Sequence, residues 1–126
     1  MKIKFEIDGA KVLAALERAP NAFKKQTRLA FKKQMTKIQR DAKLNHRFQT
    51  HSAKLEKSIR TEVDPDGAWG RVYLEEGIAP YGKWVHDGHG SWKPDKFINQ
   101  AFRKNKANLI LALQRATEVG IKKAGL

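Results

Sequence analysis

Four histidines are the side chains in this sequence best suited to metal binding or catalysis. His86 and His89 flank Asp87, a grouping whose imidazole and carboxylate groups could begin a metal site. His46 and His51 lie in a polar segment without a carboxylate cluster. A zinc site needs three or four convergent ligands, and no spacing in the chain supplies the rest. We therefore expect ordinary loop histidines, with no metal ion and no cofactor.

Motifs for covalent or acid–base catalysis are missing as well. The chain has no cysteine, so it offers no disulfide, thiolate ligand or thiol nucleophile. It contains no HExxH, GxSxG or glycine-rich phosphate loop. Glu75 and Glu76 are adjacent at the end of a predicted strand, where neighbouring side chains point to opposite faces and cannot easily share a proton. We expect no catalytic residues and a protein that is not an enzyme.

Charge is the most unusual property of the chain. Its 126 residues carry a formal net charge of +13. Residues 20–47 hold nine basic residues and one acidic residue, a net +8, whereas residues 61–95 hold three basic and seven acidic residues, a net −4. A basic surface attracts polyanions, although a solvated, solubilising face is the simplest interpretation. Oppositely charged surfaces could also meet head to tail between identical subunits.

The basic segment is predicted to be one long amphipathic helix. Pro20 suits the first turn, where its missing N–H would be unpaired in any case. The helix should run to about Leu44. Its apolar arc is expected to contain Phe23, Thr27, Phe31, Met35, Ile38 and Ala42. The opposite side is the predicted electrostatic interaction face, directed at DNA or at an acidic neighbouring subunit: Lys25, Lys32, Lys33, Lys37 and Arg40.

Two alternating segments predict a β-hairpin. Ile59, Thr61 and Val63 alternate with charged residues, as Gly70, Val72 and Leu74 do with Arg71 and Tyr73. Between them, the residues of 64–67 (Asp-Pro-Asp-Gly) are typical of a tight turn, because proline fixes φ early and glycine accepts a positive φ.

The remaining segments complete an α+β fold in one domain, residues 1–126. We expect a short strand over Ile3, Phe5 and Ile7, then a helix over 9–18 that is capped by Asp8 and turns Val12, Leu13 and Leu16 inward. Polar loops are predicted at about 45–54 and 88–95, and the aromatic segment 78–87 has no assigned type. A last helix, capped by Asp95, runs to about Lys123; its inner arc holds Ile98, Ala101, Phe102, Leu109, Ala112, Leu113 and Ala116. The small antiparallel sheet, with its β-hairpin, should pack against the two long helices.

Several apolar residues have no predicted place in the core. Leu29 and Leu44 fall among the lysines of the first long helix, and Ile121 also lies outside its own helix's inner arc. Aromatic residues stand in both polar loops, which we expect to become ordered against a neighbouring protein. The residues predicted to contact another subunit or a flanking protein are Leu29, Phe48, Trp92, Ile110 and Leu111.

No segment of the sequence predicts a membrane association. No apolar run approaches the ~20 residues that span a bilayer, and residues 1–8 lack the apolar stretch of a signal peptide. Synthesis in the cytoplasm is therefore expected.

Three short motifs occur in an order that resembles a known family. They are 52–59 (Ser-Ala-Lys-Leu-Glu-Lys-Ser-Ile), 81–88 (Tyr-Gly-Lys-Trp-Val-His-Asp-Gly) and 97–102 (Phe-Ile-Asn-Gln-Ala-Phe). This order is similar to that of the tail-completion proteins (neck or minor tail proteins) of long-tailed bacteriophages, over about residues 8–120. Those proteins carry T-G-x-L-x-x-S-I, a hairpin, Y-x-x-x-x-E-x-G-T and P-F-x-x-P-A. This chain differs by Ala53 for the usual glycine, Gly88-His89 for Gly-Thr, and Gln100 for the second proline.

The resemblance implies a virion structural protein without an active site. Such a protein takes part in tail assembly and head–tail joining, as a homo-oligomeric ring at the neck. The implied partners are other copies of the chain in a hexamer, the flanking neck, connector and tail proteins, and non-specifically bound DNA in the lumen. The implied location is the virion, after synthesis in the host cytoplasm.

The alternative function is non-specific nucleic-acid binding. The basic helix could follow phosphates, and Phe48, Trp84 and Trp92 could stack on bases. No RNP, KH, zinc-finger or helix-turn-helix motif is present. A basic ribonuclease toxin would need a cluster of histidine, arginine and acid that the sequence does not supply.

Overall fold

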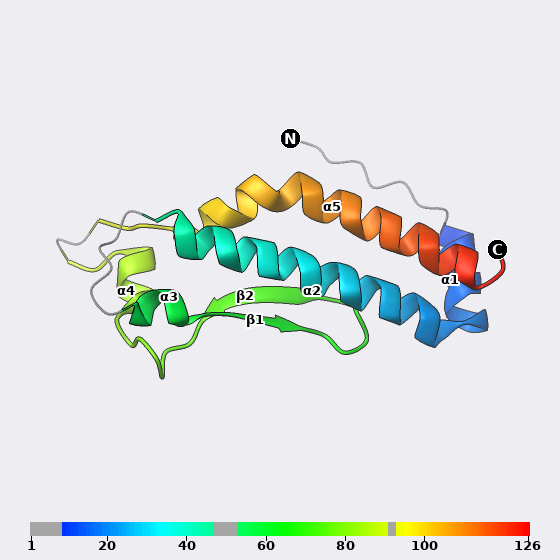
Figure 1. The fold of residues 1–126 in the computed structure, drawn as a ribbon, viewed down its shortest axis with the longest axis horizontal. Coiled ribbons are helices and arrows are strands. Elements are labelled where there is room, and N and C mark those ends of the chain that lie inside the picture. Colours follow the sequence, from blue (N-terminus) through cyan, green and yellow to red (C-terminus); the bar gives the residue numbers. More distant parts are fainter. Residues whose placement is uncertain (1–8, 47–52, 91–92) are drawn as a thin grey trace. The chain divides into compact units, whose positions relative to one another are not determined.

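The computed structural model describes residues 9–46, 53–90 and 93–126, and its elements confirm most of the predicted boundaries (Figure 1). Helix α1 spans Gly9–Arg18 and α2 spans Pro20–Leu44. Ala19 and Phe23 continue the helical hydrogen bonds across the junction, but Pro20 has no N–H to donate. This missing donor explains why α1 ends where α2 begins. The predicted strand at residues 3–7, its neighbour Asp8 and the centre of the first loop lie outside the described residues.

The fold is α+β, as predicted: two antiparallel strands pack against helices. Strand β1 is Ile59–Val63 and β2 is Gly70–Leu74. Turn chemistry closes the hairpin, because the Gly67 N–H donates to the carbonyl of Asp64 at 2.9 Å and the Ala68 N–H donates to the Asp64 carboxylate at 3.1 Å. Gly67 has φ of 74°, the left-handed conformation for which glycine is suited.

Two backbone hydrogen bonds fix the register of the hairpin. The Asp64 N–H donates to the Trp69 carbonyl at 2.9 Å, and the Glu75 N–H donates to the Ser58 carbonyl at 2.7 Å. In an antiparallel ladder every second pair is hydrogen-bonded. Thr61 and Val72 therefore form a non-bonded pair, whose backbone N–H and C=O groups point away from the partner strand.

Three further helices complete the described chain. Helix α3 is Lys54–Lys57, α4 is Gly82–Asp87 and α5 is Phe97–Lys123. Helix α3 begins at Lys54, a residue that the sequence analysis assigned to the first polar loop. Helix α4 shows that the segment 78–87, whose structure was not predicted, is helical from Gly82 onward. The last helix begins two residues after the buried Asp95 and ends at Lys123 as predicted.

The described chain divides into two compact units, each with its own buried residues. The first contains residues 1–34, 63–70 and 107–126. Its cluster consists of Ala15, Phe23 and Ile121, with Val12, Leu16 and Ala124 packed against it. Two predictions are wrong here: Leu13 is 64% exposed rather than inward-facing, and Ile121 is buried although it lies off the predicted arc. Ala15 takes the inward position on α1, because its face meets Phe23 and Ile121.

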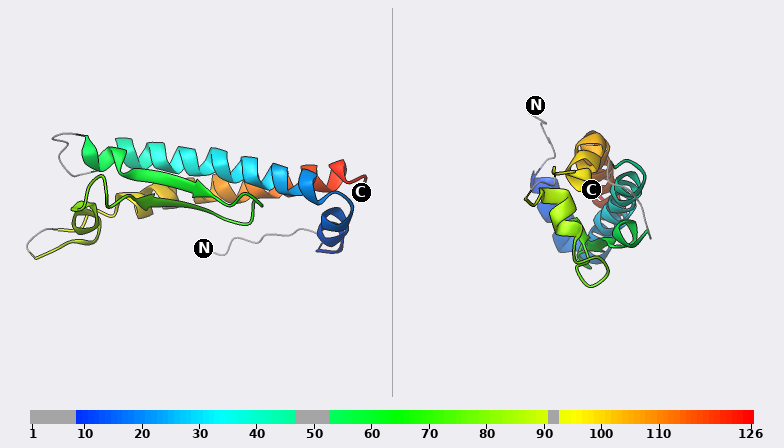
Figure 2. Two further views of the ribbon diagram at one scale, coloured as in Figure 1. Left: turned by 90° about the horizontal axis from the view of Figure 1, so that it is seen from below. Right: turned by 90° about the vertical axis from the view of Figure 1, so that its left-hand side faces the viewer.

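The second unit contains residues 35–62 and 71–106. β1 lies beside α2 in this unit (Figure 2), and Gln39 Nε2 donates to the Ile59 carbonyl at 2.7 Å. Phe102 is a further wrong prediction: it is 42% exposed, because it lies about 100° around the helix from the buried Ala101. The buried apolar residues of this unit are Met35, Ile38, Ala42, Leu55, Ile59, Ala79, Phe97 and Ala101.

Ala53, the second residue of the motif 52–59, has a strained backbone conformation. Its φ of 58° is the only positive value among the described non-glycine residues. A left-handed conformation costs an L-residue about 1–2 kcal/mol, and glycine avoids that cost at an entropic cost of about 0.5–1 kcal/mol. Ala53→Gly is therefore expected to raise the free energy of unfolding by roughly 0.5–1 kcal/mol in urea denaturation.

The control for that measurement is Ala107→Gly in the exposed part of α5. This change places glycine in a regular helix, where it should lower the free energy of unfolding by roughly 0.5–1 kcal/mol. If both variants were destabilised equally, the backbone of Ala53 would not carry the strain assigned to it.

Candidate functional site

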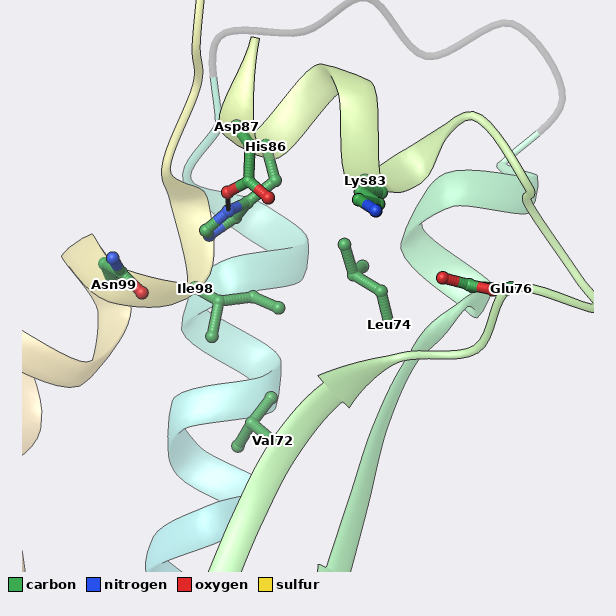
Figure 3. A pocket seen from close by; sticks show the side chains of 8 residues that line it. All are labelled: Val72, Leu74, Glu76, Lys83, His86, Asp87, Ile98 and Asn99. Carbon is green, nitrogen blue, oxygen red and sulfur yellow. Dashed lines mark hydrogen bonds and ion pairs between the residues drawn. The ribbon is translucent and has the colours of Figure 1, made fainter.

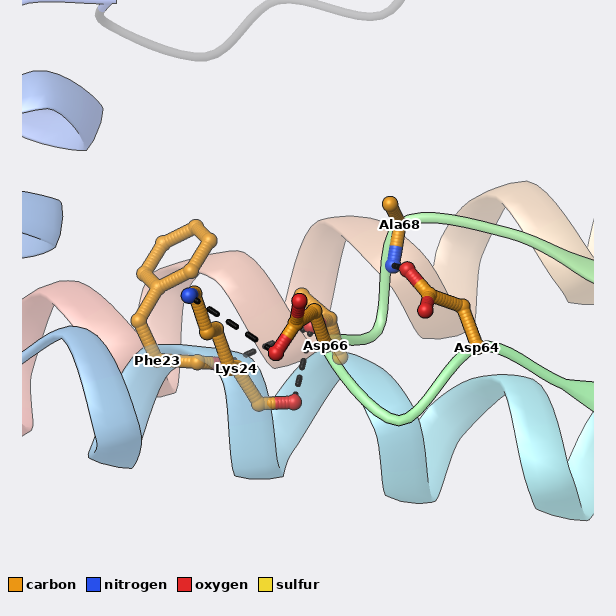
Figure 4. A network of polar contacts seen from close by, with 6 residues as sticks. Phe23, Lys24, Asp64, Asp66 and Ala68 are labelled. Atoms are coloured by element: carbon orange, nitrogen blue, oxygen red, sulfur yellow. Dashed lines mark hydrogen bonds and ion pairs between the residues drawn. The ribbon is translucent and has the colours of Figure 1, made fainter.

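The predicted electrostatic face is exposed along α2. Its five members, hereafter the basic face, all have exposed side chains: Lys25, Lys32, Lys33, Lys37 and Arg40. The first three belong to the first unit and the last two to the second. Their neighbour Lys24 behaves differently, because its ammonium group lies 3.7 Å from the carboxylate of Asp66 in the hairpin turn (Figure 4).

Exposed leucines interrupt this charged surface. Leu29 is four residues from both Lys25 and Lys33, which places it on the same side of α2, and it is 46% exposed. Leu44 stands four residues after Arg40 and is 72% exposed. Single exposed apolar side chains are ordinary on a protein surface, and these two add apolar area to the charged surface of α2.

The other residues predicted to contact a neighbouring protein differ in exposure. Leu111 is 44% exposed on α5, whereas its neighbour Ile110 is half-buried. Phe48 and Trp92 lie outside the described residues. The structure therefore presents Leu29 and Leu111 as accessible apolar residues of the first unit, and Ile110 only in part.

The described histidines are engaged with neighbouring side chains. His89 stacks on Trp84 with ring centroids 4.7 Å apart, and His86 meets the edge of Phe97 at 5.1 Å. His46 Nε2 lies 3.0 Å from a carboxylate oxygen of Glu56. Over residues 9–46, 53–90 and 93–126, no three histidine, aspartate or glutamate side chains converge on a point where a metal ion could bind.

A groove that the sequence did not predict opens in the second unit. It has a volume of about 340 Å³ and lies between β2, α4 and the start of α5 (Figure 3). Its lining is part apolar and part charged: Val72, Leu74, Glu76, Lys83, His86, Asp87, Ile98 and Asn99. The alternation of Val72 and Leu74 indicated a strand, but nothing local indicated that helices on two sides would leave a hollow there.

His86 and Asp87 give the groove its electrostatic character. His86 Nδ1 and the Asp87 carboxylate are 2.8 Å apart, and this hydrogen bond lowers the pKa of Asp87 below its usual range. The other ring nitrogen of His86 is buried, and the described residues offer it no hydrogen-bond partner. The groove therefore holds an ionised carboxylate at its rim and an unsatisfied polar atom in its wall.

None of the helices in the described ranges has the length and apolar character needed to cross a membrane. The chain matches no protein-family model, no curated protein and no solved structure.

Proposed function

We propose that this protein is a bacteriophage virion structural protein that completes the tail and joins it to the head, as a ring of identical subunits at the neck. The observation that carries the proposal is the exposed basic face of α2 with Leu29 inside it. A ring needs a heterologous interface, in which one surface binds a different surface of the next copy. In this proposal the partner surface for the basic face lies in the acidic segment 61–95, in which Glu62, Asp66, Glu76 and Asp87 are exposed.

Backbone conformation at the motif positions supports the resemblance behind this proposal. The family's usual glycine coincides with Ala53, which has φ of 58°. The glycine that the chain retains in its second motif, Gly88, has φ of 85°. Both are conformations that favour glycine. The positive φ at residues 53 and 88 is therefore a physical reason for the glycine that the family pattern has at each of these positions.

Charge and apolar contacts would contribute differently to the ring. An exposed ion pair contributes only ~0–1 kcal/mol, so the basic face sets the orientation of the subunits. Leu29 and Leu111, which are exposed, supply apolar area for affinity. Because each subunit carries a net +13, free subunits repel one another at low salt. We expect monomers in dilute solution and a ring in the virion.

Charge reversal of the basic face tests this proposal. Lys25→Glu, Lys33→Glu and Lys37→Glu are combined in one protein, and the control combines Lys57→Glu, Lys93→Glu and Lys106→Glu, which are also exposed. Both proteins lose six units of positive charge and should keep the helical circular dichroism of the wild type. In a phage that encodes it, only the basic-face variant is expected to lose infectivity and the ring at the neck in negative-stain images of virions. Normal assembly and infectivity of that variant would contradict the proposal.

The same face favours one alternative, non-specific nucleic-acid binding. Its five cations would give an affinity for DNA that falls steeply with salt, with a log–log slope of roughly −0.9 for each phosphate neutralised. A steep slope together with a monomeric mass at every concentration would favour this alternative. A hexameric mass would favour the ring.

A further inference from the structure

Most acidic side chains of the segment 61–95 are already engaged within the chain. A carboxylate oxygen of Glu62 lies 2.8 Å from the guanidinium group of Arg71, and one of Asp66 lies 3.7 Å from the ammonium group of Lys24. Three more acidic residues are buried or half-buried: Asp64, Glu75 and Asp95. These five are therefore poorly placed to bind a second copy of the chain.

Glu76 and Asp87 are the remaining acidic residues of this segment, and both are exposed. Among the described residues, no lysine or arginine forms an ion pair with either carboxylate. Asp87 Oδ1 accepts a hydrogen bond from His86 at 2.8 Å, but the Asp87 side chain is 59% exposed and its other oxygen remains available. These two carboxylates are the ones that a cationic partner can bind.

Both carboxylates belong to the groove of the second unit. In the view of Figure 3 they lie on opposite sides of Leu74, which forms the apolar part of the lining together with Val72 and Ile98. The groove lies at the edge of β2 that faces away from β1, and its volume of about 340 Å³ is ample for one aliphatic side chain. The other edge of the hairpin is occupied, because Gln39 of α2 donates to the Ile59 carbonyl at 2.7 Å. The groove thus offers an apolar hollow between two carboxylates.

The basic face carries the complementary arrangement on α2. Leu29 is 46% exposed and lies on the side of the helix opposite the buried Met35 and Ile38. Lys25 and Lys33 stand about one turn before and one turn after it, each about 6 Å away along the helix axis. Both lysines are exposed, and neither forms an ion pair with a described carboxylate. An apolar side chain between two ammonium groups is the counterpart of an apolar hollow between two carboxylates.

We propose that Leu29 of one copy occupies the groove of the next copy, where Lys25 and Lys33 pair with the carboxylates of Glu76 and Asp87. The inference rests on the proposed ring and identifies its interface. The two surfaces are different parts of the chain, so the contact is heterologous and repeats from copy to copy. The leucine supplies the apolar contact at the centre, and the charges around it set the orientation. One leucine and two exposed ion pairs make a weak contact, which agrees with monomers in dilute solution.

Disulfide trapping with the full-length protein tests the contact, because the chain has no cysteine of its own. Leu29→Cys protein (the helix probe) is mixed with 15N-labelled Ile98→Cys protein (the groove probe) at the highest soluble concentration, under mild oxidation. The mixed disulfide, identified by its mass, is expected to form roughly tenfold faster than with 15N-labelled Lys57→Cys protein, because thiols held side by side react at a high effective concentration.

The Lys57→Cys control favours the opposite result if the copies meet only by chance. Lys57 is exposed, whereas Ile98 is half-buried, so random collisions would trap the control faster. Asn99→Cys, at an exposed position of the same groove lining, replaces the groove probe if Ile98→Cys fails to fold. Trapping of the groove cysteine that is absent, or no faster than that of the control, overturns the proposal.

Charge reversal on both surfaces tests the ion pairs. Lys25→Glu and Lys33→Glu lower the net charge of the helix probe by four units, from +13 to +9, which weakens the general repulsion between copies. Trapping with the groove probe should nevertheless slow about tenfold, because two attractions become repulsions. The rate should recover when the groove probe carries Glu76→Lys and Asp87→Lys. A faster reaction in the first mixture, or no recovery in the second, would contradict the contact.

Lys83 gives a prediction in the opposite direction. It is the single lysine of the groove lining, so its ammonium group opposes the approach of Lys25 and Lys33. Lys83→Glu in the groove probe is expected to speed trapping about threefold. Lys57→Glu makes the same change of charge outside the groove and should have a much smaller effect. Equal effects of the two substitutions would show that net charge alone governs the encounter, against the proposal.

The result for this contact can be separated from the result for the ring. A phage that encodes the chain with both Leu29→Cys and Ile98→Cys should yield, after oxidation of its virions, a ladder of disulfide-linked copies. Rings in negative-stain images of those virions without the ladder would overturn the Leu29 contact alone. Trapping between purified copies, with no ring in the virions, would overturn the ring alone.

Discussion

Gly67→Ala is expected to lower the free energy of unfolding by about 2–5 kcal/mol. A Cβ at this position would lie 2.2 Å from Thr27 Oγ1, 2.7 Å from the Arg28 amide nitrogen and 2.7 Å from the Lys24 carbonyl oxygen. The last two atoms belong to the backbone of α2 and cannot rotate away. Overpacking of this kind costs roughly 1–3 kcal/mol, and the left-handed backbone costs an alanine about 1–2 kcal/mol more. Figure 4 shows the turn against the helix.

Gly90→Ala is the matched control for this prediction. Gly90 has φ of 57°, and nothing lies within 4 Å of the Cβ that it lacks. The control therefore incurs the backbone cost without the contact with a helix. Urea denaturation of both variants should give a clearly larger loss for Gly67→Ala. Similar losses in the two variants would mean that the turn does not pack on α2 as described.

Phe97→Ala is expected to have a comparable effect, a loss of about 3–5 kcal/mol in the free energy of unfolding. Phe97 is fully buried at the first residue of α5, and the ring of His86 meets its ring at an interplanar angle of 83°. Its removal leaves a cavity beside α4 and deprives His86 of its aromatic contact. The loss should appear in thermal and urea unfolding, together with a shifted His86 resonance in NMR spectra.

Phe102→Ala provides the comparison on the same helix. Phe102 is 42% exposed, so the same change of side chain removes far less buried surface. Its effect on the free energy of unfolding should stay below about 1.5 kcal/mol. Equal effects at the two positions would show that the boundary between core and surface at the start of α5 is misplaced.

The sequence by itself determined the three longer helices α1, α2 and α5, the hairpin and most of their limits. These features depend on residues close together in the chain. Pro20 ends one helix and begins the next, the residues of 64–67 form the turn, and a period of 3.6 residues marks α2. The charge of the basic face was also predictable, because the side of a helix opposite its apolar arc faces water wherever that arc is packed.

Only the tertiary structure decided which side chains the core encloses at the ends of the helices. Helical periodicity assigned three residues wrongly to the core or to the surface: Leu13, Phe102 and Ile121. A single apolar arc was assumed for all 27 residues of α5, but the two ends of that helix belong to different packed units and bury different sides. Periodicity gives the spacing of an arc, whereas the neighbouring element determines its direction.

The groove beside β2 is likewise a product of tertiary structure alone. His86 and Asp87 are adjacent in the sequence, but the apolar wall of the groove comes from β2 and Ile98, which lie on other elements. The free edge of β2 follows from the register of the hairpin together with the position of Gln39 on α2, which occupies the other edge. Such contacts join residues some 20 positions apart, and their energies depend on distances that no local pattern encodes.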